Sequence, residues 1–312
     1  MRNAAAVAQA PTSTQSALPA GPWVAEVDQL DAQQFRRCYL LPRRPVVVRG
    51  ALDAWPARRR FTPEFFLEHH ADRFVRVRGR QHRLGDIMRE QVESDATHPA
   101  PYPCTLADCR DLLPDITPRP AWGLPNRHTS ALMPKTVFDL VNHLEIFFGG
   151  PGSGFPYLHY DMLHLHTWIA QVHGAKEFTF YEPGQEELLY VHPEMPWMSR
   201  MDDVNDYRRW PLLQHARRHS VVLQAGDAAF VPCGVWHITR CVSMNITVAF
   251  DQLEASNWRQ FVHDVAAEER RKGHRARALW LGAYLGALGP LLGIAELFGA
   301  NREADWGVPR VH

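Results

Sequence analysis

The segment 144–253 most constrains the fold of this chain of 312 residues, because short apolar or β-branched runs alternate there with turn residues. Gly149-Gly150-Pro151-Gly152, Glu182-Pro183-Gly184 and Gly226-Asp227 separate the runs. Many short strands joined by such turns are typical of a sandwich or barrel. We therefore predict a mainly β fold, a double-stranded β-helix of the jelly-roll type with helical additions. The expected strands are 163–172, 177–181, 220–224, 228–231 and 245–250.

Two histidines and an aspartate inside this segment form a candidate metal site. His159 and Asp161 flank a single residue, and His237 follows in the run FVPCGVWH. Alternate residues on a strand point to the same face, so His159 and Asp161 are expected to point together into the barrel. With His237 from a later strand, they would bind Fe(II) on one face and leave coordination positions open. A histidine and an aspartate at this spacing are common by chance, so the assignment of a metal site also depends on the surrounding motifs.

Charge and cysteine content narrow the class of protein. Lys plus Arg and Asp plus Glu both number 34, so no net charge draws the chain toward nucleic acid. The five cysteines are odd in number and lack C-x-x-C spacing, which argues against a zinc ribbon or a disulfide framework. A reducing compartment, and hence a cytoplasmic location, is the expectation.

We expect the chain to divide into a disordered tail at 1–22, a main domain at 23–255 with its metal core at 144–253, and a helical region at 256–312. In the amino-terminal half we predict a buried strand at 45–50 and a helix after Thr62-Pro63. An exposed edge strand is expected at 74–79, a loop at 93–103, and a helix at 106–113 that ends before Pro114.

The helical region is expected to contain a charged amphipathic helix at 258–277 and an uncharged stretch at 278–295. Four glycines and Pro290 interrupt this stretch, which predicts a broken pair of helices. Pairs of glycines in G-x-x-x-G spacing allow close packing, either against the barrel or against a second subunit. We favour packing or a homodimer. Because 18 uncharged residues meet the lower bound for a span, membrane association stays as the alternative.

Several motifs in a fixed order give the chain a family resemblance. They are Arg44-Pro45-Val46-Val47-Val48-Arg49-Gly50 with Trp55-Pro56-Ala57, then Gly149-Gly150-Pro151-Gly152-Ser153 leading into Leu158-His159-Tyr160-Asp161, then Gln171-Val172-His173-Gly174-Ala175-Lys176, and finally Gly226-Asp227 through Pro232 to Trp236-His237. Over residues 41–252 the chain resembles the JmjC and cupin-like Fe(II)/2-oxoglutarate oxygenases. It is most similar to the branch that includes the asparaginyl hydroxylase acting on hypoxia-inducible factor.

The resemblance implies Fe(II), 2-oxoglutarate as co-substrate and dioxygen. His159, Asp161 and His237 would bind the iron, and Lys176 would bind the distal carboxylate of 2-oxoglutarate, although a lone strand lysine is more often a surface residue. The implied reaction is hydroxylation of a C–H bond in a peptide, a protein side chain or a peptide-like natural product. Demethylation is the same chemistry on an N-methyl carbon and stays open. Two rivals also stay open: a metal-dependent cupin enzyme without 2-oxoglutarate, and a non-catalytic binding protein.

The chain departs from the family pattern at two positions. Pro156 stands where many relatives carry Ser or Thr, and Thr167 stands where they tend to carry Asn. We expect the hydroxyl of Thr167 or Tyr157 to compensate in the co-substrate site. His164 and His166 also leave room for a second metal, although substrate contacts are preferred for them. Further substrate contacts are expected from the loop 122–136 and the insert 182–218.

Overall fold

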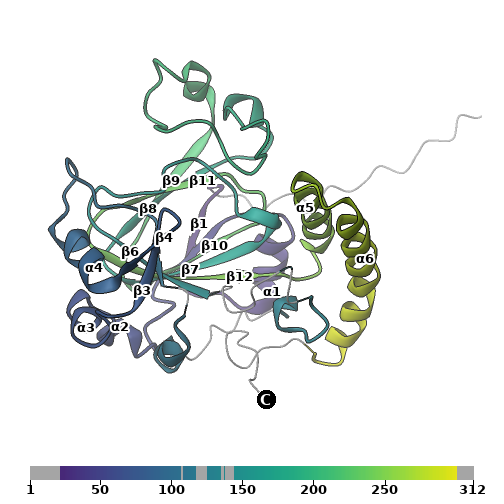
Figure 1. The fold of residues 1–312 in the computed structure, drawn as a ribbon, viewed down its shortest axis with the longest axis horizontal. Coiled ribbons are helices and arrows are strands. Elements are labelled where there is room, and N and C mark those ends of the chain that lie inside the picture. The colour runs from purple at the N-terminus through teal and green to yellow at the C-terminus, as the bar shows by residue number, and fades with distance from the viewer. Residues whose placement is uncertain (1–21, 107, 117–124, 135–136, 138–143, 301–312) are drawn as a thin grey trace, which may run out of the picture.

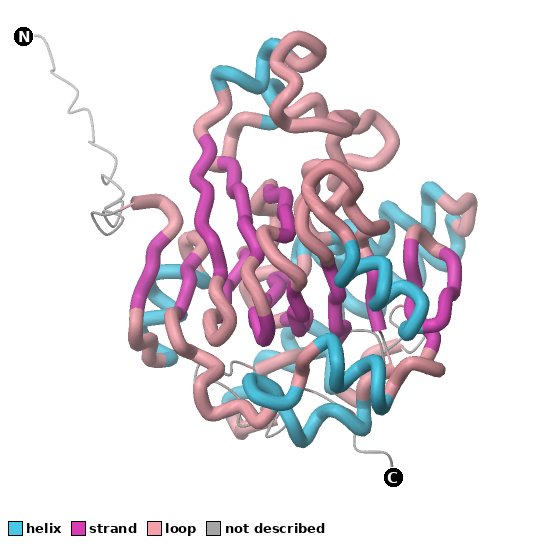
Figure 2. The backbone as a smooth tube through the Cα atoms, turned by 90° about the vertical axis from the view of Figure 1, so that its left-hand side faces the viewer, coloured by secondary structure: helices cyan, strands magenta, loops and turns pink. Residues whose placement is uncertain are grey.

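The computed structural model describes residues 22–106, 108–116, 125–134, 137 and 144–300. Two sheets form its centre, and helices and loops cover them (Figures 1 and 2). In the described residues the larger sheet has nine strands in the order β1-β2-β10-β7-β12-β6-β5-β3-β4, and the smaller has three in the order β11-β8-β9. The strands are β1 Ala25–Val27, β2 Val46–Val48, β3 Phe74–Val77, β4 Arg80–Arg83, β5 Cys104–Leu106, β6 Leu144–Gly149, β7 His166–His173, β8 Lys176–Tyr181, β9 Arg218–Leu223, β10 Ala228–Val231, β11 His237–Cys241 and β12 Asn245–Gln252.

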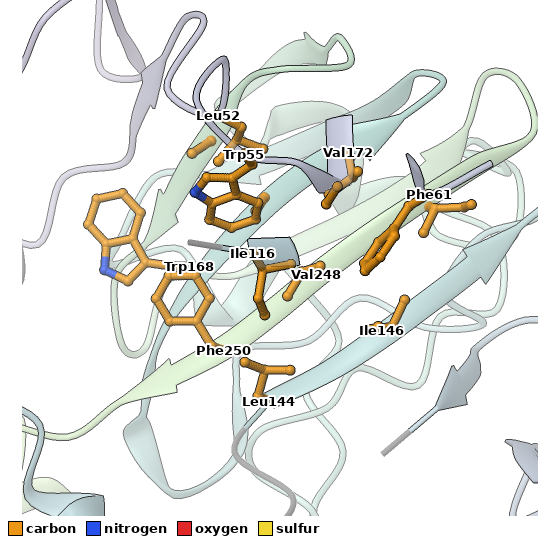
Figure 3. Close-up of a cluster of buried hydrophobic side chains, with 14 of the residues drawn as sticks. Leu52, Trp55, Phe61, Ile116, Leu144, Ile146, Trp168, Val172, Val248 and Phe250 are labelled. Carbon is orange, nitrogen blue, oxygen red and sulfur yellow. The ribbon is translucent and has the colours of Figure 1, made fainter. Parts of the chain in front are cut away.

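The nine-stranded sheet separates an apolar core on one face from a cavity on the other, because its side chains alternate between the two faces. On β12, Ile246, Val248 and Phe250 point into the core. The intervening Thr247, Ala249 and Asp251 line the cavity instead. Figure 3 shows the core side, where residues of β6, β7 and β12 meet Leu52, Trp55, Phe61 and Ile116 from the amino-terminal half. The predicted mainly β fold with helical additions is confirmed.

Short helices from the amino-terminal half cover the core face of the larger sheet. They are α1 Ala32–Phe35, the π-helix Arg36–Leu40, α2 Ala57–Arg60, α3 Pro63–His69 and α4 Leu84–Glu93. The predicted start of α3 is confirmed: the Oγ1 of Thr62 accepts a hydrogen bond from the backbone N–H of Phe65 at 3.2 Å, and Pro63 follows at the first helical position. The predicted buried strand is also confirmed, since β2 is buried along its length.

Three local predictions were wrong. The strand at 74–79 is not an edge, because β3 pairs with both β4 and β5, and β4 lies outside it. The helix at 106–113 does not form. Leu106 instead ends β5, and a 3-10 helix at Arg110–Ile116 includes Pro114. Pairing of β5 with β6 there overrides the local helical pattern.

The third wrong prediction is the start of the strand at 163–172. Leu163 and His164 belong to the 3-10 helix Met162–His164, and β7 begins at His166. The expected strands at 177–181, 220–224, 228–231 and 245–250 correspond to β8, β9, β10 and β12. Within 144–253 the structure adds β6 and β11, which were not among the expected strands.

Two carboxy-terminal helices lie side by side at one flank of the sheets: α5 Trp258–Arg271 and α6 Arg275–Leu297 (Figure 1). The predicted break at Pro290 is absent, because α6 continues through the proline. Apolar residues of α6 pack along α5 and stabilise the whole helix. Of the paired glycines, Gly289 makes the closest approach: a Cβ there would lie 2.4 Å from Nε1 of Trp258.

The opposite face of α6 is apolar and exposed. Leu279, Trp280, Leu291, Ile294 and Leu297 are between 57% and 81% exposed. By length and composition, α6 is the one helix of the described chain that could cross a membrane, and 33% of its apolar window is buried in the protein. Core helices of soluble proteins can pass the same test, so this observation alone carries little weight.

Candidate active site

A cavity of about 270 Å³ lies between the two sheets. Thr167 and Thr247 line it from the larger sheet, and Lys176, Phe178 and Thr239 line it from the smaller sheet. Because each strand sends alternate residues inward, polar groups far apart in the sequence share one enclosed space. Such a cavity, mostly apolar with a few convergent polar groups, is typical of small-molecule sites.

His159, Asp161 and His237 come together at this cavity, and their ligand atoms all lie within 4.8 Å of one another. The Nε2 of His237 lies 3.9 Å from an Oδ of Asp161. Backbone carbonyls take the other ring nitrogens: the Nδ1 of His159 lies 3.2 Å from the oxygen of Tyr157, and the Nδ1 of His237 lies 3.0 Å from the oxygen of Val235. These contacts leave both Nε2 atoms available to a metal.

The chemistry of this donor set fits a divalent metal. The Oδ2 of Asp161 is buried and has no hydrogen-bond partner, which is costly for a carboxylate unless a cation binds it. Burial, with a smaller contribution from His237, holds the pKa of His159 well below its usual value. That imidazole is therefore neutral, as a metal ligand must be. Within the described residues no other group of three such ligands meets in this way.

The backbone that carries Asp161 differs from the expectation. His159 does pair with His237, and each backbone N–H donates to the other's carbonyl, at 3.1 and 2.7 Å. Asp161, however, is the N-cap residue of the 3-10 helix Met162–His164 and lies outside any strand. The two side chains reach one cavity as predicted, but a turn rather than strand alternation places the carboxylate.

Lys176 lies at the start of β8, directly after the turn at Gly174, whose φ of +65° favours glycine. Its side chain is buried, and its Nζ donates to the hydroxyl of Tyr102 at 2.9 Å. Burial lowers the pKa of this lysine to about 8. In the part of the chain that the structure describes, no carboxylate forms an ion pair with Lys176, so the cavity holds a buried cation that lacks an anion.

Tyr102 is a residue that the sequence reasoning missed. It lies in the segment predicted as a loop, just before β5, and its ring also contacts Phe155 at 5.5 Å between centroids. Of the two hydroxyls expected to help bind the co-substrate, that of Thr167 donates to Asp251 at 3.1 Å. Tyr157 lines the cavity beside His159, with ring centroids 5.6 Å apart. Tyr102 is therefore the residue whose hydroxyl the structure places directly on Lys176.

The model of the cupin-like domain family matches residues 32–251, more than half of the chain. The chain belongs to this family. Among curated proteins it is 27% identical over 241 residues to the human 2-oxoglutarate and iron-dependent oxygenase JMJD4, covering 69% of this chain and 57% of that protein. It is 25% identical over 236 residues to the Arabidopsis thaliana lysine-specific demethylase JMJ30, covering 71% of this chain and 52% of that one. The chain thus spans about half the length of these relatives.

Over a shorter segment, the sequence identity to a relative is higher. It is 29% identical over 102 residues to the Mus musculus 2-oxoglutarate and iron-dependent oxygenase JMJD4, covering 31% of this chain and 23% of that protein. The JmjC resemblance expected from the sequence motifs is confirmed by these relatives together with the family model.

Two further carboxyl groups lie in the cavity of this cupin-like domain, and sequence reasoning did not single them out. Asp251 on β12 and Glu145 on β6 both line it. Burial, with a smaller contribution from Asp161, holds the pKa of Asp251 well above its usual value. Burial also raises the pKa of Glu145. Given the register of β6 and β12, the alternation of side chains along each strand places both carboxyl groups on the cavity face.

The histidines near Asp161 have other partners, so the structure does not support a second metal. The Nδ1 of His164 lies 2.6 Å from a carboxylate oxygen of Asp264, and the Nδ1 of His166 accepts from the backbone N–H of Cys233 at 3.0 Å. Neither histidine lines the cavity. The insert 182–218 does reach it through Trp197. The loop 122–136 lies partly outside the described residues, and none of its described members lines the cavity.

Proposed function

We propose that this protein is an Fe(II)- and 2-oxoglutarate-dependent oxygenase that hydroxylates a C–H bond of a peptide or protein side chain, or of a peptide-like natural product. One observation carries the proposal: a two-histidine, one-carboxylate cluster faces the same cavity as a buried lysine without a carboxylate partner. Among the relatives, proteins named as 2-oxoglutarate and iron-dependent oxygenases support this assignment.

His159, Asp161 and His237 would hold the iron. When bound, iron with 2-oxoglutarate and dioxygen supplies the oxidising power that inserts an oxygen atom into a C–H bond. The Nε2 atoms of the two histidines and the unpartnered Oδ2 of Asp161 provide the donors. Because Asp161 supplies the third ligand, a halide has no vacated position, which favours hydroxylation over halogenation.

Lys176 would bind the distal carboxylate of 2-oxoglutarate. In the buried site, a point charge attracts a carboxylate more strongly than it would in water. The Tyr102 hydroxyl accepts one of the three ammonium protons, which leaves two for a ligand in the cavity that Lys176 lines. Phe147 and Phe178 line the same space and exclude water from the ion pair. The protein contributes geometry, holding co-substrate and substrate in fixed positions.

The chemical outcome can be tested with a panel of peptides under air. We expect succinate to form in step with a product that is 16 Da heavier than the peptide, because hydroxylation adds one oxygen atom. Mass spectrometry of the peptide and an assay for formaldehyde give the two readouts. Stoichiometric formaldehyde with loss of a methyl group would instead identify a demethylase. If neither a heavier peptide nor formaldehyde forms in the presence of iron and 2-oxoglutarate, a cupin of other chemistry is favoured.

A second copy of the chain is the partner that we propose for the exposed face of α6. The face is apolar and carries small residues, Ala283 and Gly286, that allow close approach of another helix. A cytoplasmic location is proposed from the five cysteines, which are odd in number and lack C-x-x-C spacing. A lipid surface is the alternative occupant of the same face.

Introducing charge on that face tests the homodimer. Leu279→Glu and Leu291→Glu replace side chains that are 73% and 60% exposed, so the folded monomer should tolerate them. We expect the wild type to be dimeric and both variants monomeric by analytical ultracentrifugation. Phe74→Glu is the control, because Phe74 is 61% exposed on β3, which is not part of the helix pair. A monomeric wild type that sediments with lipid vesicles would support the membrane alternative and contradict the dimer.

A further inference from the structure

A side-chain hydrogen bond connects α5 to the turn that follows Asp161. The Nδ1 of His164 lies 2.6 Å from the Oδ2 of Asp264, which is 100 residues away in the sequence. Both side chains are about one-fifth exposed. The same Asp264 receives a second contact from His263 at 3.1 Å through its other oxygen. Neither Asp264 nor His164 lines the cavity, so the pair acts on the site through its neighbours.

The ring of His164 touches both segments that carry metal-ligand candidates. On one side it packs against the ring of Tyr160, the residue between His159 and Asp161, with centroids 4.8 Å apart. On the other side it lies against Gly234, in the turn before His237, where a Cβ would lie 3.4 Å from the ring. A change in the orientation of this ring would therefore alter the positions of all three metal-ligand candidates.

The backbone between Asp161 and β7 is strained. Leu163 and His164 have φ values of +59° and +49°, a region that residues with a Cβ seldom adopt. Such a strained residue persists only where its surroundings fix it. The described contacts do so from α5: the Nδ2 of Asn257 donates to the carbonyl of His164 at 3.0 Å, and Leu163 packs against the apolar cluster of α5 and α6.

We propose that His164 and Asp264 are positioning residues that fix the direction of the Asp161 carboxylate, so that α5 controls the geometry of the metal site. The inference rests on the proposed function, because it takes Asp161 as a metal ligand. A strained turn would otherwise relax toward ordinary backbone angles and move the carboxylate that begins it. Removal of groups that orient metal ligands typically lowers metal affinity by about 10- to 100-fold.

Metal binding without turnover tests the proposal. Free Mn(II) is measured by electron paramagnetic resonance as the metal-free protein is titrated, and the absorption spectrum of the Co(II) form is recorded. For Asp264→Ala we expect a Kd for Mn(II) about tenfold above that of the wild type and an altered Co(II) spectrum. Asp264→Asn keeps a hydrogen-bond acceptor for His164 and should recover most of the affinity. Glu268→Gln is the matched control, since this α5 carboxylate pairs with Arg271 instead.

Failure of the positioning inference and failure of the metal-ligand assignment give different results. If Asp264→Ala lowers the unfolding temperature but binds Mn(II) with the wild-type Kd and spectrum, the pair is structural and the inference is wrong. If the wild type itself does not bind Mn(II), or if Asp161→Ala binds it as well as the wild type does, the ligand assignment beneath the inference fails.

Discussion

Asp161→Ala is expected to lose stoichiometric iron and, with it, the oxidation of 2-oxoglutarate. The substitution removes the single carboxylate of the proposed ligand set, so two neutral imidazoles remain to hold a doubly charged ion. Loss of a direct ligand should weaken metal binding by about 100-fold or more, beyond the effect typical of supporting residues. Metal content by mass spectrometry after gel filtration and succinate formation from 2-oxoglutarate are the two measurements.

Asp251→Asn is the control for this assignment. Asp251 lines the same cavity, and burial together with the nearby Asp161 raises its pKa, but it does not belong to the three-residue cluster. We expect this variant to retain iron at the wild-type stoichiometry. Loss of iron in Asp251→Asn together with retention in Asp161→Ala would show that the wrong carboxylate has been assigned to the metal.

Lys176→Met is expected to raise the Kd for 2-oxoglutarate by about 10- to 100-fold, while metal affinity stays at the wild-type value. Methionine keeps much of the buried side-chain volume beside Phe147 but removes the charge. A hydrogen bond to a charged group contributes about 1.5–3 kcal/mol, which corresponds to that change in Kd. Anaerobic titration of the Fe(II) protein measures it. An unchanged Kd would refute Lys176 as the co-substrate anchor.

The pH dependence of the same equilibrium gives a second readout. The pKa of Lys176 is lowered to about 8, so the ammonium that attracts a carboxylate is present below that pH and is lost above it. A bound dianion favours the charged form, and 2-oxoglutarate binding should therefore weaken by up to about tenfold per pH unit above pH 8. The Lys176→Met variant should lack this dependence. A wild-type Kd that is constant from pH 7 to 9.5 would contradict the assignment.

The strands that form the site could be predicted because their patterns are local. Ala228–Val231 is apolar and is followed by Pro232, and Lys176–Tyr181 contains three aromatic residues and is followed by Glu182-Pro183-Gly184. His159, Asp161 and His237 could be singled out because their motifs surround them in a fixed order. The spacing of His159 and Asp161 led to the right cavity for an incorrect reason, since Asp161 lies at a turn.

The features that escaped prediction depend on tertiary contacts. The approach of Tyr102 to Lys176 depends on β5 pairing with β6, and no local pattern marks a loop tyrosine for such a role. The left-handed turn at Leu163 and His164 uses residues that do not favour it, because α5 holds the turn from outside. Pro290 failed to break α6 for a similar reason, as packing on α5 outweighs the lost hydrogen bond.

The most direct test of the proposed function is an anaerobic titration of the purified protein, first with Fe(II) and then with 2-oxoglutarate, by visible absorption. It requires no knowledge of the substrate. We expect a saturable charge-transfer band that is lost in Asp161→Ala and needs more 2-oxoglutarate in Lys176→Met. Tight iron binding without any band would contradict the use of 2-oxoglutarate and favour a cupin of different chemistry. Absence of iron binding would contradict the enzyme assignment altogether and favour a binding protein.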